Sequence, residues 1–412
     1  MTETEKRVPD LRFKGFIEDW EQRKLEKVLH ERKLRKKISE ETPLLAFAAG
    51  QGVIDRSERK TNNRDFLTKD SSTKTYLLTK YDDIVYNPSN LKYGAIDRNK
   101  HGQGVISPIY VTFETEEVSS FIELIVRGDS FKQRALQYEE GTVTKRQSVK
   151  PESLLSLSIA LPISKMEQQQ IGDFFKQLDD TIALHQRKLN LLKQLKQTYL
   201  QQLFPQNEEN IPALRFAGFS DIWEQRKLGD LAESFEYGLN ASAKIYDGEN
   251  KYIRITDIDE SSHLFLQKNL TSPDTDLSTA NNYLLETGDL LFARTGASVG
   301  KSYQYNITDG KVYFAGFLIR VRIRTEFNSS FIFQNTLTSN YQNFIKITSQ
   351  RSGQPGVNAQ EYATFNVVIP TKKEQDQLGR FFEQLDKTIA VHQCKFAKLL
   401  ELKNALLGKM FL

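Results

Sequence analysis

Cysteine, histidine and long apolar runs are scarce in this sequence. The single cysteine among 412 residues, Cys394, excludes a disulfide framework and a cysteine-based metal site. No segment approaches the ~18 uninterrupted apolar residues of a membrane span, and the N-terminus has no apolar signal core. We therefore expect a cytoplasmic protein without a membrane partner.

The composition is that of an ordinary folded protein. Hydrophobic residues make up 39% of the chain and charged residues 27%, and 412 residues are enough for two or three domains. The net charge of +4 permits a polyanionic partner without requiring one. The five histidines show no pairing with a candidate nucleophile, which argues against catalysis by this chain.

Two blocks of sequence occur twice. The first, VPDLRFKGFIEDWEQRKL at 8–25, returns as IPALRFAGFSDIWEQRKL at 211–228. The second, LPISKMEQQQIGDFFKQLDDTIALHQ from Leu161, returns as IPTKKEQDQLGRFFEQLDKTIAVHQ from Ile369. A period of about 200 residues excludes a solenoid, whose repeats span ~20–50 residues. The chain therefore consists of two tandem copies of one unit, each with an opening block, a diverged middle and a closing block.

Each closing block predicts a long helix. Ser164 with Glu167, and Thr371 with Glu374, fit a capping box, in which hydroxyl and carboxylate bind backbone N–H groups of the first turn. Apolar residues then recur in alternating steps of four and three, the pattern of a coiled-coil seam. The predicted seam residues are Ile171, Phe175, Leu178, Ile182, Leu189, Leu192, Leu378, Phe382, Leu385, Ile389, Phe396 and Leu399.

Two seams in one chain can supply each other's partner. We therefore predict an intramolecular antiparallel coiled coil of helices ~55 Å long, with homodimerisation or an ordinary bundle face as the alternative. Histidine and then lysine interrupt both seams in the same register, at His185, Lys196, His392 and Lys403. We expect the histidines to be packed side chains rather than metal ligands.

The diverged middles are rich in β-branched and aromatic residues with Gly, Asn and Asp between them, which predicts many short strands. The fold class is therefore α+β, with internal pseudo-twofold symmetry. Mixed α/β domains occupy 1–163 and 206–370, and long helices occupy 164–205 and 371–412. Turns that contain Asp83 and Asp289 are expected to open equivalent buried strands.

Basic residues in the middles are interleaved with Gly, Asn and Gln, a composition that suits contacts with phosphates and base edges. In the segment 319–324 isoleucine and valine alternate with arginine, which predicts an exposed basic face, and 109–114 is its expected counterpart. Each cluster alone is more often a solvated surface. The candidate DNA-binding residues are Lys36, Arg64, Asn87, Lys92, Arg98, Lys100, Lys145, Arg146, Gln147, Arg294, Lys301, Arg320, Arg322, Arg351 and Gln354.

Three segments match cofactor motifs only in part. FAAGQG at 47–52 contains glycines like those of nucleotide and S-adenosylmethionine sites but lacks the strand, helix and downstream acidic residue around them. NPSN at 87–90 lacks the second proline and the aromatic residue of the adenine methyltransferase motif. GASVGK at 296–301 departs from the spacing of a phosphate-binding loop. We interpret none of them as a cofactor site.

The repeated blocks together resemble the specificity subunit of type I restriction-modification enzymes. The resemblance is carried by the doubled LRFxGFxxxWEQRKL and EQ-x-x-[IL]-G-x-FF-x-QLD-x-TIA-x-HQ blocks. The segment GDLLFARTGASVGK and the loops around Gln147 and Gln354 add to it, and it spans essentially the whole chain. It implies two target recognition domains, each binding half of a bipartite, asymmetric site in double-stranded DNA, held apart by conserved spacer helices.

The resemblance also implies partners. Two modification subunits, which are methyltransferases, would dock on the helices, and restriction subunits would translocate and cleave DNA. The chain itself would have no catalytic residues and no cofactor, since S-adenosylmethionine, ATP and Mg²⁺ belong to the partner subunits. The alternatives are a specificity subunit of a methyltransferase-only system, a degenerate DNA adenine methyltransferase, and a scaffold that does not bind DNA.

Overall fold

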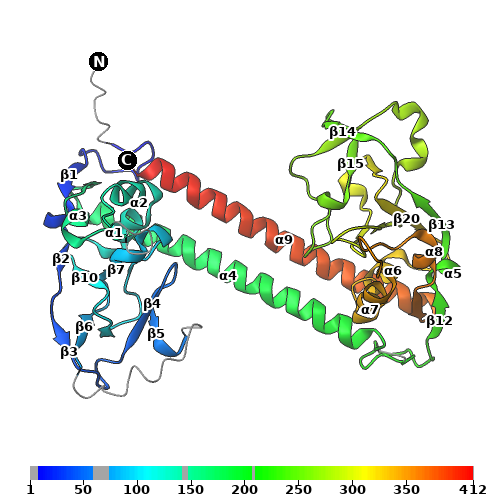
Figure 1. The fold of residues 1–412 in the computed structure, drawn as a ribbon, viewed down its shortest axis with the longest axis horizontal. Coiled ribbons are helices and arrows are strands. Elements are labelled where there is room, and N and C mark those ends of the chain that lie inside the picture. Colours follow the sequence, from blue (N-terminus) through cyan, green and yellow to red (C-terminus); the bar gives the residue numbers. More distant parts are fainter. Residues whose placement is uncertain (1–7, 59–73, 142–146, 207–208, 412) are drawn as a thin grey trace. The chain divides into compact units, whose positions relative to one another are not determined.

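The computed structural model describes most of the chain, namely residues 8–58, 74–141, 147–206 and 209–411. Contacts divide the chain into two compact units. Unit 1 consists of residues 1–185 and 395–412, and unit 2 of residues 186–394, so each contains a mixed α/β domain and part of both long helices (Figure 1). The predicted mixture of helix and sheet is confirmed. None of the helices in the described ranges combines the length and apolar character that a membrane span requires.

Unit 1 is built on an antiparallel sheet of order β2-β10-β7-β8, with a smaller sheet β3-β6-β9 and the hairpin β4-β5. Its helices are α1 (Ser119–Arg127), α2 (Asp129–Leu136) and α3 (Pro151–Leu155), with short 3₁₀ turns η1 (Leu25–Lys27), η2 (Arg56–Glu58) and η4 (Pro88–Tyr93). Its strands are β1 (Glu21–Lys24), β2 (His30–Glu31), β3 (Arg35–Lys36), β4 (Leu45–Ala48), β5 (Gly52–Asp55), β6 (Tyr76–Thr79), β7 (Ile84–Tyr86), β8 (Ile96–Arg98), β9 (Gly104–Ile106), β10 (Val111–Glu114) and β11 (Ser158–Leu161).

Unit 2 repeats the main sheet in the order β13-β20-β17-β18 and adds the pairs β14-β16 and β15-β19. Its helices are α5 (Leu228–Leu231), α6 (Ser329–Asn335), α7 (Ser339–Thr348) and α8 (Ala359–Ala363), with 3₁₀ turns η6 (Ile255–Asp257), η7 (Leu277–Thr279), η8 (Asn281–Tyr283) and η9 (Ile307–Asp309). Its strands are β12 (Glu224–Lys227), β13 (Ala232–Tyr237), β14 (Ser242–Ile245), β15 (Lys251–Ile253), β16 (Thr271–Asp274), β17 (Asp289–Ala293), β18 (Ser302–Gln304), β19 (Val312–Phe314), β20 (Leu318–Ile323) and β21 (Asn366–Ile369).

The strand register of the two main sheets corrects the predicted alignment of residues 109–114 with residues 319–324. Val111 of β10 pairs with Tyr86, and Ile319 of β20 pairs with Phe292 at the equivalent place. The predicted alignment of 109–114 with 319–324 is therefore wrong by two residues, and Ile109 is exposed and precedes the strand. The alternating pattern alone fixes which residues share a face, but a shift of two residues preserves that face.

Two helices of 39 residues each close the two copies, α4 (Lys165–Leu203) and α9 (Lys372–Met410). In unit 2, Nζ of Lys196 lies 2.6 Å from Oδ1 of Asp386, and Tyr199 packs on Phe381 with ring centroids 5.1 Å apart. Residue numbers rise along α4 as they fall along α9, so the helices pack antiparallel, as predicted (Figure 1).

Unit 1 contains the reciprocal contacts. Lys403 of α9 pairs with Asp179 of α4, and the ring of Phe411 packs on Phe175. Lys403 occupies the position in the second copy that Lys196 occupies in the first, so each seam lysine binds an aspartate of the opposite helix. Seam burial is uneven: Ile171, Phe175, Leu189, Leu378, Phe382 and Ile389 are buried, whereas Leu178, Ile182, Leu192, Leu385, Phe396 and Leu399 are half-buried.

The expected capping boxes are not formed as predicted, because their glutamates bind arginines instead. Arg12 donates two hydrogen bonds to Glu167 at 2.6 and 2.7 Å, and Arg215 donates two to Glu374 at 2.7 Å each. Both carboxylates are fully buried, so each ion pair fixes an opening block to the closing block of its own copy. We call these two ion pairs the clamps.

The glutamine after each clamp glutamate holds the start of another helix. Oε1 of Gln168 accepts from the backbone N of Val118, which precedes α1, at 3.1 Å. Oε1 of Gln375 accepts from the backbone N of Asn328, which precedes α6, at 3.0 Å. The repeated Glu-Gln pair is thus explained by two separate contacts within each unit.

In each unit the repeated Trp-Glu-Gln-Arg-Lys-Leu string contains one strand of a two-stranded antiparallel sheet. Glu21–Lys24 pairs antiparallel with β11, and Glu224–Lys227 pairs with β21. Trp20 and Trp223 at the start of each string are 3% and 2% exposed and belong to the cores of unit 1 and unit 2 respectively. The string therefore joins the start of each copy to the strand that leads into its long helix.

Candidate nucleic-acid interface

In each unit the candidate interface adjoins the turn before a buried central strand. Asp83, before β7, accepts a hydrogen bond from the backbone N of Lys80 at 2.8 Å. Asp289, which opens β17, accepts one from the backbone N of Glu286 at 2.9 Å. The carboxylates cap their turns and are 2% and 1% exposed, so the predicted equivalence of the two turns is confirmed.

Each of these aspartates binds an arginine, but a different strand supplies it. Arg32, after β2, donates to Asp83 at 2.9 and 3.0 Å. Arg322 of β20 donates to Asp289 at 2.9 and 3.1 Å. Burial raises the pKa of Asp83, although Arg32 acts in the opposite direction. These guanidinium groups stabilise the turns that lead into β7 and β17, the strands that the candidate loops follow.

The segments that follow β7 and β17 differ in structure. After β7 the chain forms η4, and Oδ1 of Asn87 caps it by accepting from the backbone N of Ser89 at 3.0 Å. After β17 the chain turns at Gly296 and Gly300, which have φ of +78° and +84°. A Cβ at Gly300 would lie 2.7 Å from Ile345, so the second turn also needs glycine for space.

A second loop is tied to each of these segments by an equivalent backbone hydrogen bond. The N–H of Val149 donates to the carbonyl of Pro88 at 3.0 Å, and the N–H of Val357 donates to the carbonyl of Arg294 at 2.9 Å. Val149 precedes α3 and Val357 precedes α8. Each unit therefore brings together two predicted DNA-binding loops that lie roughly sixty residues apart in sequence.

In unit 2 these two loops carry Arg294 and Gln354, and Arg294 lies near Tyr237 at the end of β13. The guanidinium carbon of Arg294 lies 5.0 Å from the ring centroid of Tyr237. Nε2 of Gln354 lies 3.0 Å from the place that a Cβ at Gly296 would occupy, so the loop carrying Gln354 packs on the turn after β17. A guanidinium group close to an aromatic ring can still donate its N–H groups to a ligand.

A comparison with models of known protein families identifies the family of this chain. A family model described as the type I restriction modification DNA specificity domain matches residues 103–194 and 221–401. These ranges cover well over half of the chain. The chain belongs to this family.

One solved structure supports the same fold. The chain is similar to the S subunit of a type I restriction-modification system from M. genitalium, with a TM-score of 0.66 and 15% identity over 98% of this chain and 99% of that chain. An HsdS subunit from Thermoanaerobacter tengcongensis matches with a TM-score of 0.40 and 15% identity over 100% and 99% of the two chains. A search of curated proteins gave no match.

The predicted DNA-binding residues of this specificity-family chain differ widely in exposure. The exposed residues are Lys36, Lys100, Arg351 and Gln354. The half-buried residues are Lys92, Gln147, Arg294, Lys301 and Arg322, and the buried residues are Asn87, Arg98 and Arg320. Arg64, Lys145 and Arg146 lie outside the described residues. The DNA contacts of all of them stay predictions.

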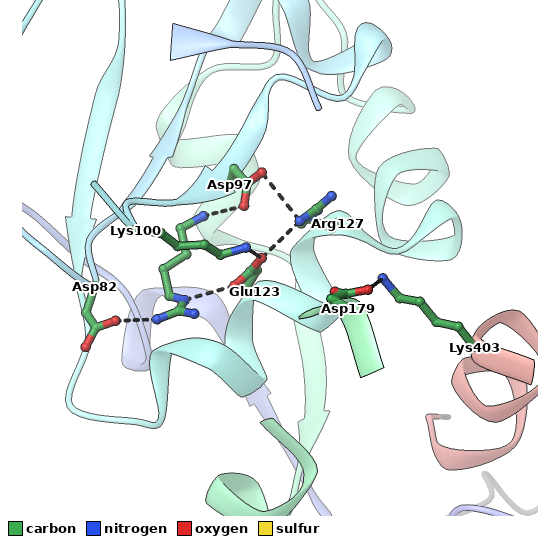
Figure 2. A network of polar contacts seen from close by, with 8 residues as sticks. Asp82, Asp97, Lys100, Glu123, Arg127, Asp179 and Lys403 are labelled. Carbon is green, nitrogen blue, oxygen red and sulfur yellow. Dashed lines mark hydrogen bonds and ion pairs between the residues drawn. The ribbon is translucent and has the colours of Figure 1, made fainter. Parts of the chain in front are cut away.

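Arg98 and Lys100 belong to an internal ion-pair network in unit 1 (Figure 2). Nε of Arg98 donates to Glu123 at 2.8 Å, and its Nη1 donates to Asp82 at 2.6 Å. Lys100 also binds Glu123, and Arg127 lies between Glu123 and Asp97, at 3.0 and 3.5 Å (Figure 2). A phosphate would have to compete with these carboxylates for Arg98 and Lys100.

The network separates the pKa values of its two buried carboxyl groups. Burial raises the pKa of Asp97 to about 6, and the neighbouring Arg127 only partly offsets it. Burial also acts to raise the pKa of Glu123, but Lys100 and Arg98 outweigh it and the pKa lies below its ordinary value. Glu123 therefore stays ionised to a lower pH than Asp97, opposite the cations Lys100 and Arg98.

The expected exposed basic face of β20 is wrong for Arg320. Arg320 is only 4% exposed, because Glu236 on the neighbouring strand β13 binds it and Asp289 lies 3.8 Å away. Arg322 is bound by Asp289 as described above. The alternation of the strand was predicted correctly, but acidic residues on adjacent strands bind Arg320 and Arg322, and only Arg320 is buried by them.

Other predicted cations also have partners within the protein. Lys92 lies 3.6 Å from Glu139, and Nζ of Lys301 donates to the carbonyl of Ile258 at 3.1 Å. Arg351 binds Glu361 and the backbone carbonyls of Thr348, at the end of α7, and Gln350. Tyr237, under Arg294, was not predicted, because its partner lies more than fifty residues away and no local pattern signals the contact.

Proposed function

We propose that this chain is the DNA-recognition subunit of a type I restriction-modification complex. It binds a bipartite, asymmetric site in double-stranded DNA, with one half-site bound by the domain of each unit. One observation supports this most directly. The loop after β7 and the loop after β17 are held at equivalent places by the same backbone hydrogen bond, yet they carry different side chains. Equivalent placement with different chemistry is what recognition of two unlike half-sites requires.

The repeated helices favour docking of modification subunits. Leu184 of α4 and Val391 of α9 occupy equivalent positions and are 65% and 51% exposed. Leu195 and Leu402 form a second equivalent pair, 42% and 48% exposed. Exposed apolar side chains repeated along a helix suit a partner surface, and two copies of that surface suit two copies of one partner. Restriction subunits would join the same complex.

In this proposal the chain recognises DNA and its partners carry the chemistry. S-adenosylmethionine would bind to the modification subunits, and ATP and Mg²⁺ to the restriction subunits. The chain supplies the placement of those subunits on a chosen sequence. Because phosphate contacts release bound cations from DNA, the affinity of the complex for DNA should fall steeply as salt is added.

The test is co-expression with a modification subunit, followed by mapping of methylated adenines. We expect one bipartite motif with two unlike halves. Exchanging residues 30–160 for the middle of another family member should change one half of the motif and leave the other intact. A motif that changes in both halves, or in neither, would contradict the assignment of one half-site to each domain.

A further inference from the structure

A pocket of about 680 Å³ in unit 1 is lined by both segments that resemble methyltransferase motifs in part. The tip of the β4-β5 hairpin contributes one side, and the segment after β7 contributes another. The hairpin tip turns at Gly50 and Gly52, which have φ of +79° and +75°, and its two alanines leave the pocket open. Six lining residues carry the argument: Phe47, Gln51, Asn87, Asn90, Tyr93 and Tyr110.

Aromatic rings form the wall and the rim of this pocket. Phe47 and Tyr110 are buried, and their ring centroids lie 5.6 Å apart. Tyr93 is 67% exposed and lines the pocket, and Nζ of Lys92 lies 5.6 Å from its ring centroid. An exposed aromatic ring beside a pocket offers a stacking surface for a flat ligand.

Asn87 presents a hydrogen-bond donor to the same space. Its side chain is 6% exposed, and Oδ1 is occupied by the backbone N of Ser89. Its Nδ2 makes no hydrogen bond to any residue that the structure describes, although Asn87 lines the pocket. An N–H group that makes no hydrogen bond at the wall of a pocket favours an occupant that carries an acceptor atom.

The charges of the lining residues limit which kinds of ligand the pocket can bind. Among the described residues that line it, Glu58 carries the one charge, and no lysine or arginine is present. A phosphate group would therefore find no cation among the lining residues, although Nζ of Lys92 lies 5.6 Å from the ring centroid of Tyr93. The side chains of Gln51 and Asn90 make no hydrogen bond to the described part of the chain and can donate or accept.

We propose that this pocket takes a nucleobase of the half-site bound by unit 1, stacked on Tyr93 and hydrogen-bonded by Nδ2 of Asn87. A base is flat, uncharged and edged with acceptors such as N7, O6 or O4, which match these groups. Gln51 and Asn90 complete recognition of the base edge. The inference rests on the proposed function, since it names the residues of unit 1 that select a base.

The test compares Asn87→Asp, Tyr93→Ala and the control Tyr81→Ala in the full complex with its modification subunits. Asn87→Asp keeps an oxygen that can cap Ser89 and replaces the donor by a negatively charged acceptor. Tyr81 is also exposed, at 54%, but lies at the other end of β7. We expect Tyr93→Ala to weaken binding to the cognate duplex about tenfold, the scale of one lost base–aromatic stack. We expect Asn87→Asp to relax the methylated motif at one base pair of one half, and Tyr81→Ala to change neither property.

The outcomes separate this inference from the proposed function. Wild-type affinity and an unaltered motif in both variants, while exchange of residues 30–160 still changes half of the motif, would overturn the pocket and leave the function standing. Failure of that exchange would overturn the function itself. If Asn87→Asp lowers the unfolding temperature, Tyr93→Ala decides, because an exposed ring can be removed without unfolding the domain.

Discussion

Unit 1 and unit 2 share a frame but fill the space between sheet and helix differently. In unit 1 this space holds the ion-pair network formed by Asp97, Arg98, Glu123 and Arg127. The strand pairings and helix starts place the following residues at the equivalent positions of unit 2: Tyr303, Gln304, Phe333 and Leu337. The same topology therefore tolerates an ionic or a neutral interior, provided that the clamps and strand order are kept. The interior side chains therefore differ between the two units, as do the side chains of the surface loops.

The clamps should show the largest effect, and they should differ between the units. Arg215→Ala leaves Glu374 buried without its partner, which costs about 4 kcal/mol of unfolding free energy. Arg12→Ala should cost about 1 kcal/mol less, because Nε1 of Trp20 also lies 3.4 Å from Glu167. Trp223 makes no such contact among the described residues.

The two tryptophans allow each unit to be measured separately. Urea unfolding followed by fluorescence reports unit 1 in a Trp223→Phe background and unit 2 in a Trp20→Phe background. The control is the double variant Arg215→Ala with Glu374→Gln, which removes the stranded charge and should recover most of the loss. Equal losses in the two units would refute the assigned role of Trp20.

The long helices and the central strands could be predicted because the chain contains each of them twice. Heptad spacing gave the helices and their antiparallel packing, and the aligned turns gave the central strands. The clamps were missed because Arg12 and Glu167 are far apart in sequence, and an S/T-x-x-E pattern has a local interpretation that competes with the long-range one. The interface was harder still. Whether an arginine such as Arg98 faces DNA or a buried glutamate depends on what the neighbouring elements place beside it, and the sequence of a single strand does not contain that information.

The ionic interior of unit 1 provides the next comparison. Glu123→Gln removes the charge that Arg98, Lys100 and Arg127 share, and we expect a loss of about 3 kcal/mol in the unfolding free energy of unit 1. The matched change in unit 2, Phe333→Leu, should cost only about 1 kcal/mol, because it alters packing without stranding a charge. Similar losses of unfolding free energy in the two variants would mean that the network stabilises unit 1 through packing and not through charge.

The raised pKa of Asp97 predicts a pH dependence in the stability of unit 1. A carboxyl group with a pKa of about 6 in the folded state and ~3.9 when unfolded binds its proton more tightly in the folded protein. The unfolding free energy of unit 1 should therefore fall by about 2 kcal/mol as pH rises from ~4 to ~6, and stay level above that range. Asp97→Asn should remove this contribution, so the curves of the wild type and the variant should converge as pH rises from ~4 to ~6. A wild-type decline that Asp97→Asn leaves unchanged would assign it to another group, such as Asp83, whose pKa burial also raises.

The smallest effect is expected where the units are most alike, at the reciprocal lysine–aspartate pairs of the two helices. Lys196 is 14% exposed and Asp386 30%, whereas Lys403 and Asp179 are 22% and 40% exposed. Partly exposed ion pairs contribute about 0.5 kcal/mol, so Lys196→Ala should cost slightly more than Lys403→Ala. Lys196→Asp adds repulsion from Asp386, and Asp386→Lys in the same chain should restore the wild-type unfolding midpoint. If the double change restores nothing, the pair does not act through charge, and packing of the lysine stem explains its place in the seam.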